Sequence, residues 1–190
     1  MMRQFGLTAL VISTMLVAGC SGNGPEYGYA TPKKICDVNV AVSDVQPLLP
    51  PGEAIKESSR GTPGESRSCG MVVDERVDLS VSFSRQTGEV DIAREADDDY
   101  IGLRRVSLGG AVKSAAVADD GAVAWMACSP KPDQPQYETP EAKAGRYTHL
   151  VLEIHTGDGI KKPDNIKEWR AHIEKFLRAY VPELIEAWCA

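Results

Sequence analysis

The stretch NIKEWRAHIEKFLRAYVPELIEAW, residues 165–188, carries the strongest secondary-structure signal in the chain. Its large apolar side chains recur at steps of three and four residues, which is the period of one face of an α-helix. They are Ile166, Trp169, Ile173, Phe176, Leu177, Tyr180, Leu184 and Trp188. Asn165 followed by Glu168 predicts a capping-box-like start, and Pro182 should kink or restart the helix because it lacks an amide donor. At about 1.5–3 kcal/mol for each buried large side chain, this face should supply a major part of the core.

Residues 77–84 give the clearest signal for a β-strand. Apolar side chains alternate there with short polar ones, and this period of two is typical of a strand with one buried and one wet face. The apolar positions are Val77, Leu79, Val81 and Phe83, and the polar positions are Asp78, Ser80, Ser82 and Ser84. The apolar residues 71–73 precede this strand across the polar residues 74–76, which predicts a hairpin.

Two more segments are expected to contain strands. Residues 111–128 predict a second hairpin, because Asp120-Gly121 is a favoured two-residue turn whose positions tolerate a positive φ. Its second arm, residues 122–128, is apolar on both faces and should be a central strand that is covered on both sides. Residues 147–155 predict another strand. Its core-facing side chains would be Leu150, Leu152 and Ile154, and its outward-facing ones His149, Val151, Glu153 and His155.

The other segments of the chain give weaker signals. Residues 38–49 predict a helix that Asp37 or Ser43 would cap and the Pro-Pro-Gly at 50–52 would end, although valines at 38, 40 and 42 also suit a strand. The remaining expected segments are a loop at 51–68, a short helix within 87–103 and a long proline-rich surface loop at 129–145. The order of elements predicts an α+β fold, in which N-terminal and long C-terminal helices pack on an antiparallel sheet of about five strands.

The N-terminus predicts where the protein resides. Val17-Ala18-Gly19-Cys20 closes an apolar run that follows Arg3. The run is too short and too broken to span a bilayer core of about 30 Å, which requires about 20 apolar residues. A basic start, a short apolar region and small residues before a cleavage site predict a signal peptide at residues 1–19. On this pattern alone, the segment could be an ordinary signal peptide followed by an incidental cysteine at position 20.

An aliphatic residue, two small residues and then cysteine resembles the lipobox of bacterial lipoproteins, with Val17 where leucine is commoner. The resemblance implies that Cys20 carries a thioether-linked diacylglycerol and becomes the first residue of the mature protein. At about 0.8 kcal/mol for each buried CH₂, two or three acyl chains would hold it durably at the extracytoplasmic face of the cell membrane. Residues 20–34, rich in Gly, Pro and Ser, then predict a flexible tether, and residues 35–190 a single globular domain.

Four cysteines follow Cys20, namely Cys36, Cys69, Cys128 and Cys189. An even number outside the cytoplasm indicates two disulfides, and four cysteines allow three pairings. We favour Cys36–Cys69, which closes a short local loop, and Cys128–Cys189, which ties the end of the chain to a strand. Each disulfide would stabilise the fold by about 2–4 kcal/mol, mainly by restricting the unfolded chain.

The composition argues against several classes of function. The formal net charge of −6 disfavours nucleic acid, whose phosphates dominate its binding. No metal or cofactor is expected, because there is no CxxC and the histidines His149, His155 and His172 are not spaced as ligands. His149 and His155 would stand about 20 Å apart along one strand. They are expected to lie on a solvated surface, where Glu153 and His155 would form at most a polar pair.

No serine lies in a GxSxG motif, and no other catalytic constellation is evident, so we do not expect an enzyme. Trp125, Trp169 and Trp188 are the candidate lining of an apolar pocket between sheet and helix, although packing in the core is the favoured interpretation. If the protein binds one hydrophobic ligand, these tryptophans are the first place to look.

The arrangement of cysteines resembles a group of actinobacterial cell-envelope lipoproteins of unknown function. The shared features are a lipobox ending in Cys20, a short tether, Cys36 in an early helix, Cys69 ahead of the alternating strand at 77–83, and Cys189 in a terminal helix. This resemblance implies no activity. We therefore expect a lipid-anchored, non-catalytic binding module with a protein partner in the envelope. The alternatives are a carrier of a small hydrophobic ligand or lipid and, third, an envelope hydrolase.

Overall fold

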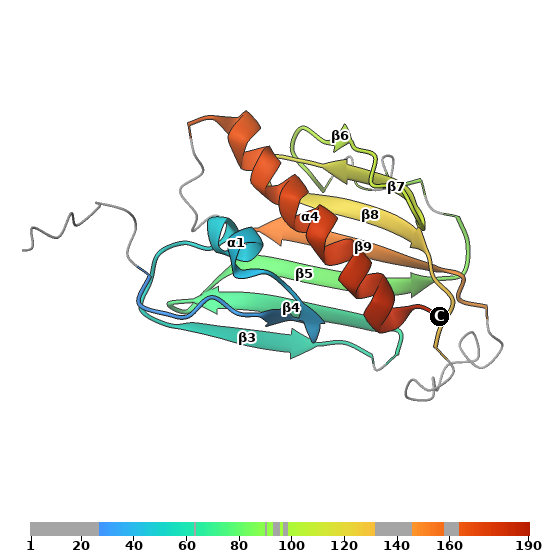
Figure 1. Cartoon of the computed structure of the whole chain (residues 1–190), viewed down its shortest axis with the longest axis horizontal. Helices are drawn as coiled ribbons and strands as arrows, with labels where there is room; N and C mark the ends of the chain where they lie inside the picture. Colours follow the sequence, from blue (N-terminus) through green and yellow to red (C-terminus); the bar gives the residue numbers. More distant parts are fainter. Residues whose placement is uncertain are drawn as a thin grey trace, which may run out of the picture.

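Figure 1 shows the computed structural model, which describes residues 27–62, 64–89, 91–92, 96, 99–131, 146–157 and 164–190. The strands are β1 (Lys34–Ile35), β2 (Val38–Asn39), β3 (Ile55–Arg60), β4 (Ser66–Val73), β5 (Arg76–Gln86), β6 (Arg104–Arg105), β7 (Val112–Val117), β8 (Gly121–Ala127) and β9 (His149–Thr156). The helices are α1 (Val42–Val45), the 3-10 helix η1 (Gln46–Leu48) and α4 (Ile166–Trp188). The predicted α+β class is confirmed.

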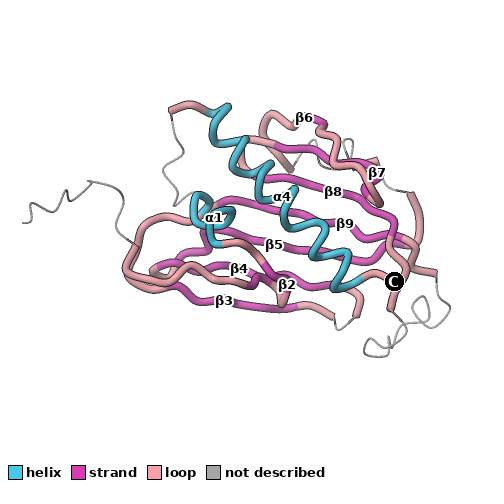
Figure 2. Tube along the Cα trace, viewed as in Figure 1, coloured by secondary structure: helices cyan, strands magenta, loops and turns pink. Residues whose placement is uncertain are grey.

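In this part of the chain, seven strands form one antiparallel sheet in the order β3-β4-β5-β9-β8-β7-β6, and β1 and β2 form a separate small sheet. Helix α4 crosses one face of the large sheet diagonally, and α1 and β2 lie on the same face (Figure 2). The main core fills the space between these layers. A smaller cluster of buried side chains, which includes Tyr100, Val123 and Trp125, lies on the other face of β8. The central strand β8 is therefore covered on both sides, as its two apolar faces predicted.

The sheet has more strands than the five predicted, and the additional ones are β3 and β6. The loop predicted at 51–68 is wrong, because it contains β3 and the start of β4. Lys56 to Arg60 are all exposed, so β3 has no alternating apolar pattern to reveal it. Its hydrogen bonds to β4 define the strand, in a register that runs from Ile55 opposite Val73 to Arg60 opposite Ser68.

The helix predicted at 38–49 is wrong over its first half. Residues 38–39 form strand β2, and the helical part consists only of α1 and η1. Cys36 and Asp37 have φ values of 54° and 65°, so the chain turns tightly between β1 and β2 instead of entering a helix. Neither predicted cap is used, because the N-cap of α1 is Ala41, which makes no side-chain capping bond.

The packed domain begins before Ile35, within the stretch predicted as a tether. The Gly28 amide donates to the Gly52 carbonyl at 2.7 Å, and the Tyr27 hydroxyl donates to the Leu49 carbonyl at 3.4 Å. The Tyr29 hydroxyl also donates to the Pro50 carbonyl. These contacts hold residues 27–29 against the chain that follows η1. Cys20 and the predicted signal peptide lie outside the described residues.

Strand β5 keeps the predicted alternation from Leu79 to Phe83 but loses it at its start. Val77 is 54% exposed, whereas the carboxylate-bearing Asp78 is 0% exposed. The cause is a β-bulge, since Met71 pairs with Leu79 but the next residue, Val72, pairs with Val77. The extra residue reverses the faces at this point. Both carboxylate oxygens of Asp78 are buried without a hydrogen-bond partner.

Replacing Asp78 with asparagine should stabilise the protein at pH 7, by roughly 1–2 kcal/mol, because burial disfavours the ionised carboxylate more than its neighbours favour it. Burial raises the pKa of Asp78, Arg76 and the Val73 backbone oppose this increase, and Asp74 adds a smaller one. The protonated Asp78 side chain is compatible with burial, so its full contribution to stability is present below the pKa of this group in the unfolded chain. The contribution is lost as the pH rises through the higher pKa of the group in the folded protein. Urea unfolding from pH 3 to pH 8 checks this: the advantage of Asp78→Asn should grow with pH, and a constant difference would contradict it.

The hairpin of β7 and β8 is confirmed, but its glycine has a different role from the one predicted. Neither Asp120 nor Gly121 has a positive φ. Gly121 is the first residue of β8 and lies close to β9, where a Cβ atom would be 1.9 Å from the Ile154 carbonyl oxygen. The glycine is thus required by close packing between strands and not by the turn.

Strand β9 and helix α4 follow the sequence pattern closely, except at Ile166, the first residue of α4, which is 38% exposed. Leu150, Leu152 and Ile154 are 0% exposed and face the core. The Asn165 side chain caps α4 by accepting a hydrogen bond from the Lys167 amide at 3.2 Å. The helix continues through Pro182 to Trp188, so the predicted restart at the proline is wrong.

Candidate functional site

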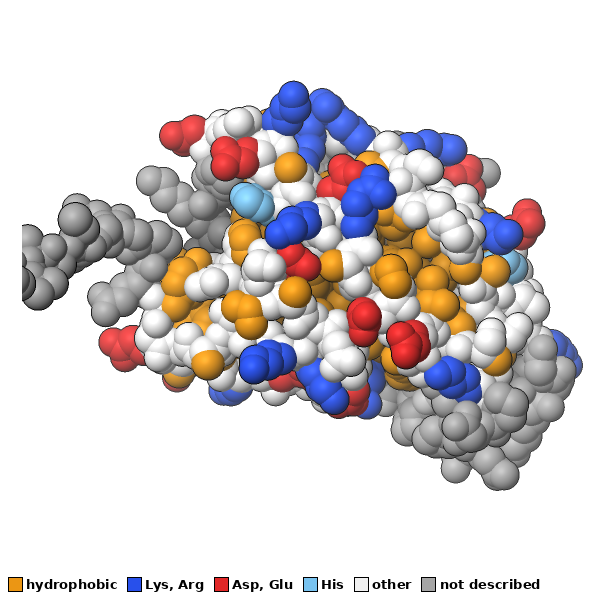
Figure 3. Space-filling view, viewed as in Figure 1, with side chains coloured by type: hydrophobic (Ala, Val, Ile, Leu, Met, Phe, Trp, Pro, Cys, Tyr) orange, Lys and Arg blue, Asp and Glu red, His pale blue; other side chains and the backbone are white. Residues whose placement is uncertain are grey.

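An apolar groove runs beside the C-terminal half of α4, and we call it the α4 groove. Its volume is about 490 Å³. One wall is the segment before and at the start of β7, and the other is α4. The lining residues are Leu108, Gly109, Gly110, Ala111, Val112, Arg178, Val181, Pro182, Ile185 and Glu186. Figure 3 shows hydrophobic side chains gathered on this face of the molecule, with basic and acidic side chains around them.

The backbone of the strand-side wall is held by hydrogen bonds and turned by two glycines. Gly109 and Gly110 have φ values of 75° and 61°, a region that side chains other than glycine rarely adopt. The Val112 amide donates to the Gly109 carbonyl at 3.2 Å, which closes the turn. The Ala127 amide donates to the Ala111 carbonyl at 3.0 Å, which joins the wall to β8. The wall is therefore a preformed part of the sheet edge.

On the helix side, the groove has an apolar centre and one charge toward each end. Val181 is buried, Ile185 is half-buried and the Pro182 ring is exposed. Arg178 forms an ion pair with Glu174, one turn earlier on α4, at 2.6 Å, and its side chain is 47% exposed. Glu186 is exposed, and its main-chain carbonyl accepts a hydrogen bond from the Lys131 ammonium. An occupant would meet aliphatic carbon in the middle and opposite charges at the two ends.

The α4 groove was not predicted from the sequence. Val181 and Ile185 extend the apolar arc of α4 beyond the core-facing positions Phe176, Leu177 and Leu184, and this excess width was the available signal. The opposite wall has no comparable pattern. Its position beside α4 follows from the order of the strands in the sheet.

The three tryptophans pack in the core, which was the favoured interpretation, and they do not come together around one pocket. Trp169 lies in the main core, and its Nε1 donates to the Asp119 carbonyl at 2.9 Å. Trp188 packs edge-on against Phe83, with ring centroids 4.6 Å apart. Trp125 belongs to the second cluster, on the opposite face of the sheet. Adjacent residues of a strand point to opposite faces, and Trp125 alternates with the core residues Ala124 and Met126.

The histidines of β9 are half-buried against aromatic rings and do not lie on an open solvated surface. His155 stacks on Tyr100 with ring centroids 4.5 Å apart, and its Nε2 lies 3.1 Å from the Tyr100 hydroxyl. His149 stacks on Trp125 at 4.5 Å. Glu153 accepts a hydrogen bond from the Ser82 hydroxyl at 3.2 Å, so the polar pair suggested for Glu153 and His155 is replaced by other partners.

The Tyr100–His155 contact is better suited to packing than to catalysis. The Tyr100 hydroxyl donates to the Ala122 carbonyl at 3.2 Å, and burial raises the pKa of Tyr100 strongly. A tyrosine that acts as a base or nucleophile needs its pKa lowered toward the working pH. The dyad therefore gives no support to the hydrolase alternative. His172 is half-buried on α4, apart from both β9 histidines.

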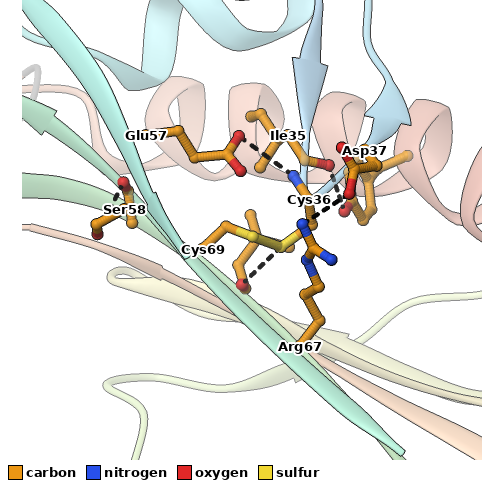
Figure 4. The surroundings of a disulfide bond; sticks show 10 residues. Ile35, Cys36, Asp37, Glu57, Ser58, Arg67 and Cys69 are labelled. Atoms are coloured by element: carbon orange, nitrogen blue, oxygen red, sulfur yellow. Dashed lines mark hydrogen bonds and ion pairs between the residues drawn. A yellow bond between two sulfur atoms is a disulfide. The ribbon is translucent and has the colours of Figure 1, made fainter. Parts of the chain in front are cut away.

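Both favoured disulfides are present. Figure 4 shows Cys36–Cys69, which joins the turn between β1 and β2 to strand β4. The Cys36 amide donates to Glu57 at 3.4 Å, and Arg67 pairs with Asp37 at 2.6 Å on either side of the bond. These contacts bind the small sheet to the edge of the large one. The site is buried and structural in character.

The second disulfide, Cys128–Cys189, joins the end of β8 to the residue that follows α4. Arg85 lies beside it, 5% exposed, and donates to the Trp188 carbonyl at 2.7 Å and to the Gly64 carbonyl at 2.8 Å. The Ala190 amide donates to the Ser129 carbonyl at 2.9 Å. The C-terminal end of α4, which carries one end of the groove, is thus fixed to the sheet.

The face of the sheet opposite α4 is polar where it is formed by β3, β4 and β5. Residues directly opposite each other across strands share a face, which places Arg60, Ser68, Ser82 and Glu153 in one row and Ser58, Gly70 and Ser80 in another. Two shallow hollows of about 280 and 290 Å³ lie on this surface. The serines of the alternating strand therefore form a hydrophilic surface.

Among the described residues, no three His, Cys, Asp or Glu side chains lie close enough to hold a metal ion. Within the same ranges, no helix is long and apolar enough to cross a membrane. Comparisons with protein-family models, with curated proteins and with solved structures return no match.

Proposed function

We propose that this protein is a lipoprotein of the cell envelope, anchored through Cys20 at the extracytoplasmic face of the cell membrane. Its domain would act as a non-catalytic module that binds another envelope component through the α4 groove. The groove is the observation that carries the binding function. We further propose, from the cysteine arrangement, kinship with the actinobacterial envelope lipoproteins of unknown function.

Two observations support an extracytoplasmic location. The sequence Val17-Ala18-Gly19-Cys20 follows a signal-peptide-like run and resembles a lipobox. The four remaining cysteines are all paired in disulfides, and such bonds form and persist in oxidising compartments. The first bond closes a separation of 33 residues and the second one of 61, so both would constrain the unfolded chain.

The shape and chemistry of the groove support binding. Exposed apolar surface bordered by polar groups is typical of sites that contact a protein, a membrane or a ligand. Here the apolar wall of α4 includes a proline ring, which offers no main-chain donor, and the opposite wall is fixed by hydrogen bonds to the sheet. A rigid apolar groove of this kind loses little conformational freedom when it is filled.

A carrier of a small hydrophobic ligand is the second candidate. The volume of about 490 Å³ falls within the roughly 300–1,000 Å³ typical of small-molecule sites. The side chains along its centre, Val112, Val181 and Ile185, are aliphatic and suit an alkyl chain. This site replaces the tryptophan-lined pocket as the place where such a ligand would lie.

Photocrosslinking in intact cells tests the proposal. A photoreactive residue at Leu108, inside the groove, should form a crosslink to an envelope protein, whereas one at the exposed Ser59 on the far edge of the sheet should not. Placing a charge in the groove with Pro182→Glu should remove the crosslink. The Cys20→Ala variant should leave the membrane fraction and should also lose the crosslink.

The outcomes separate the two candidates. A Leu108 adduct with the mass of a lipid or another small molecule would support the carrier. Equal labelling from Leu108 and Ser59 would argue against the groove as a binding surface. A protein adduct that persists in the Cys20→Ala version would contradict the requirement for the anchor.

A further inference from the structure

We infer that the partner which the α4 groove accepts is the same groove of a second copy of this chain. In this arrangement two α4 helices pack antiparallel around a two-fold axis that passes beside Pro182. The inference rests on the proposed function, because it assigns the occupant of the same groove. It adds the identity of a partner and the symmetry of the contact.

The charges on α4 are arranged for pairing with an identical copy. Arg178 and Glu186 both line the groove and lie four residues before and four residues after Pro182. At about 1.5 Å per residue, each is about 6 Å along the helix from the proline. A two-fold axis at Pro182 then brings Arg178 of each copy to Glu186 of the other, which forms the same ion pair twice. Such self-complementarity is what an interface with two-fold symmetry requires.

Both charged groups retain the capacity to make these pairs. Arg178 uses its Nε and Nη2 atoms toward one oxygen of Glu174, on its own helix, and a guanidinium carries five N–H donors. Glu186 is engaged through its main-chain carbonyl, and among the ion pairs of the described residues none involves its carboxylate. Rim charges of this kind contribute more to orientation and specificity than to affinity.

The residue at the axis is chemically suitable. A side chain on a two-fold axis meets its own copy, so a charged group there would face a like charge. Pro182 is uncharged, exposed and apolar, and the apolar Val181 and Ile185 line the groove beside it. Across the groove, Cβ atoms at Gly109 and Gly110 would meet nothing within 4 Å, so this wall leaves space for an approaching helix.

Attachment to a membrane would favour this contact. An anchored protein is confined to a layer, which raises its effective concentration, so an interface that is weak in solution becomes populated without further contacts. Opposite charges at the two ends of the groove also disfavour the parallel arrangement, in which Arg178 would meet Arg178.

The test uses the full-length, lipidated protein in phosphatidylcholine liposomes. Two populations carry a donor or an acceptor dye on an unnatural residue at the exposed Ser59, and energy transfer is measured against surface density. Arg178→Glu alone and Glu186→Arg alone should each weaken association about tenfold, because both contacts in each homodimer become like-charged. A mixture of the two variants should restore transfer, since both contacts are then between opposite charges.

Two more variants make the test specific. Pro182→Glu should abolish transfer by placing two carboxylates at the axis, and it should not impair folding, because glutamate is a better helix former than proline. Lys167→Glu, the same size of charge change at the exposed start of α4, should leave transfer unchanged.

Two results would overturn the inference: no density-dependent transfer in the wild-type protein, or no recovery in the mixture of the two charge variants. Neither would remove the proposed function if Leu108 still crosslinks to a different envelope protein. Conversely, loss of every Leu108 crosslink, including one between two copies, would count against the groove itself.

Discussion

Replacing Gly121 with alanine is expected to lower the free energy of unfolding by about 3 kcal/mol or more. The new Cβ would lie 1.9 Å from the Ile154 carbonyl oxygen and 2.7 Å from the Cε1 atom of Tyr100. Neither neighbour can move freely. Ile154 is part of the central strand β9, and Tyr100 is held by the Ala122 carbonyl and by His155.

Urea unfolding at pH 7 measures this effect, with Gly88→Ala as the matched control. A Cβ at Gly88 would meet nothing within 4 Å, and its backbone does not have a positive φ, so the control should change stability little. Equal effects of the two substitutions would show that β8 and β9 are not in close contact at Gly121. If Gly121→Ala fails to accumulate while Gly88→Ala expresses normally, this would also agree with a much larger loss of stability at Gly121.

Removing the Cys128–Cys189 disulfide by a double alanine substitution should cost about 4 kcal/mol. The bond closes a separation of 61 residues, and its loss restores conformational freedom to the unfolded chain. Removing Cys36–Cys69, which closes a separation of 33 residues, should cost slightly less, because the entropic effect grows with the logarithm of the loop length. Thermal unfolding of both double variants, under identical oxidising conditions, gives the comparison.

The Cys128–Cys189 variant should also disturb the α4 groove, because this bond fixes the C-terminal end of α4 to the sheet. Hydrogen exchange should therefore increase at Ile185 and Glu186 before it increases at Ile173 or Phe176, which lie nearer the other end of the helix. The Cys36–Cys69 variant is the control, since its contacts are with β1, β2 and β4. Equal changes in exchange near Ile185 in the two variants would contradict the assignment.

The sequence predicted those elements whose side chains alternate or recur strongly. The apolar positions of α4, the cap at Asn165 and the core-facing residues of β9 were all visible in the pattern, because each element buries one face against the rest. The disulfides followed from the even number of cysteines, and the favoured pairing is the one observed. The periodicity, the cap and the number of cysteines can be recognised along the chain, whereas the choice among the three pairings was decided by the structure.

Elements that depend on distant partners were missed. Strand β3 has polar, exposed side chains and exists through its main-chain bonds to β4. The bulge at Asp78 reversed the faces expected at the start of β5, because pairing with β4 and not the side-chain pattern determines the local register. The stacking of His149 on Trp125, and of His155 on Tyr100, follows from the second cluster over the opposite face of the sheet.

The sequence alone therefore determined the α+β class, the long C-terminal helix, the expectation of two disulfides and the prediction of a lipid anchor at Cys20. Only the tertiary structure decided that Val181 and Ile185 face the wall at residues 108–112, and that Arg178 and Glu186 stand at opposite ends of one groove. The physical reason is that a helical period fixes which residues share a face. The partner of that face depends on the order of strands across the sheet, which main-chain pairing between distant segments sets.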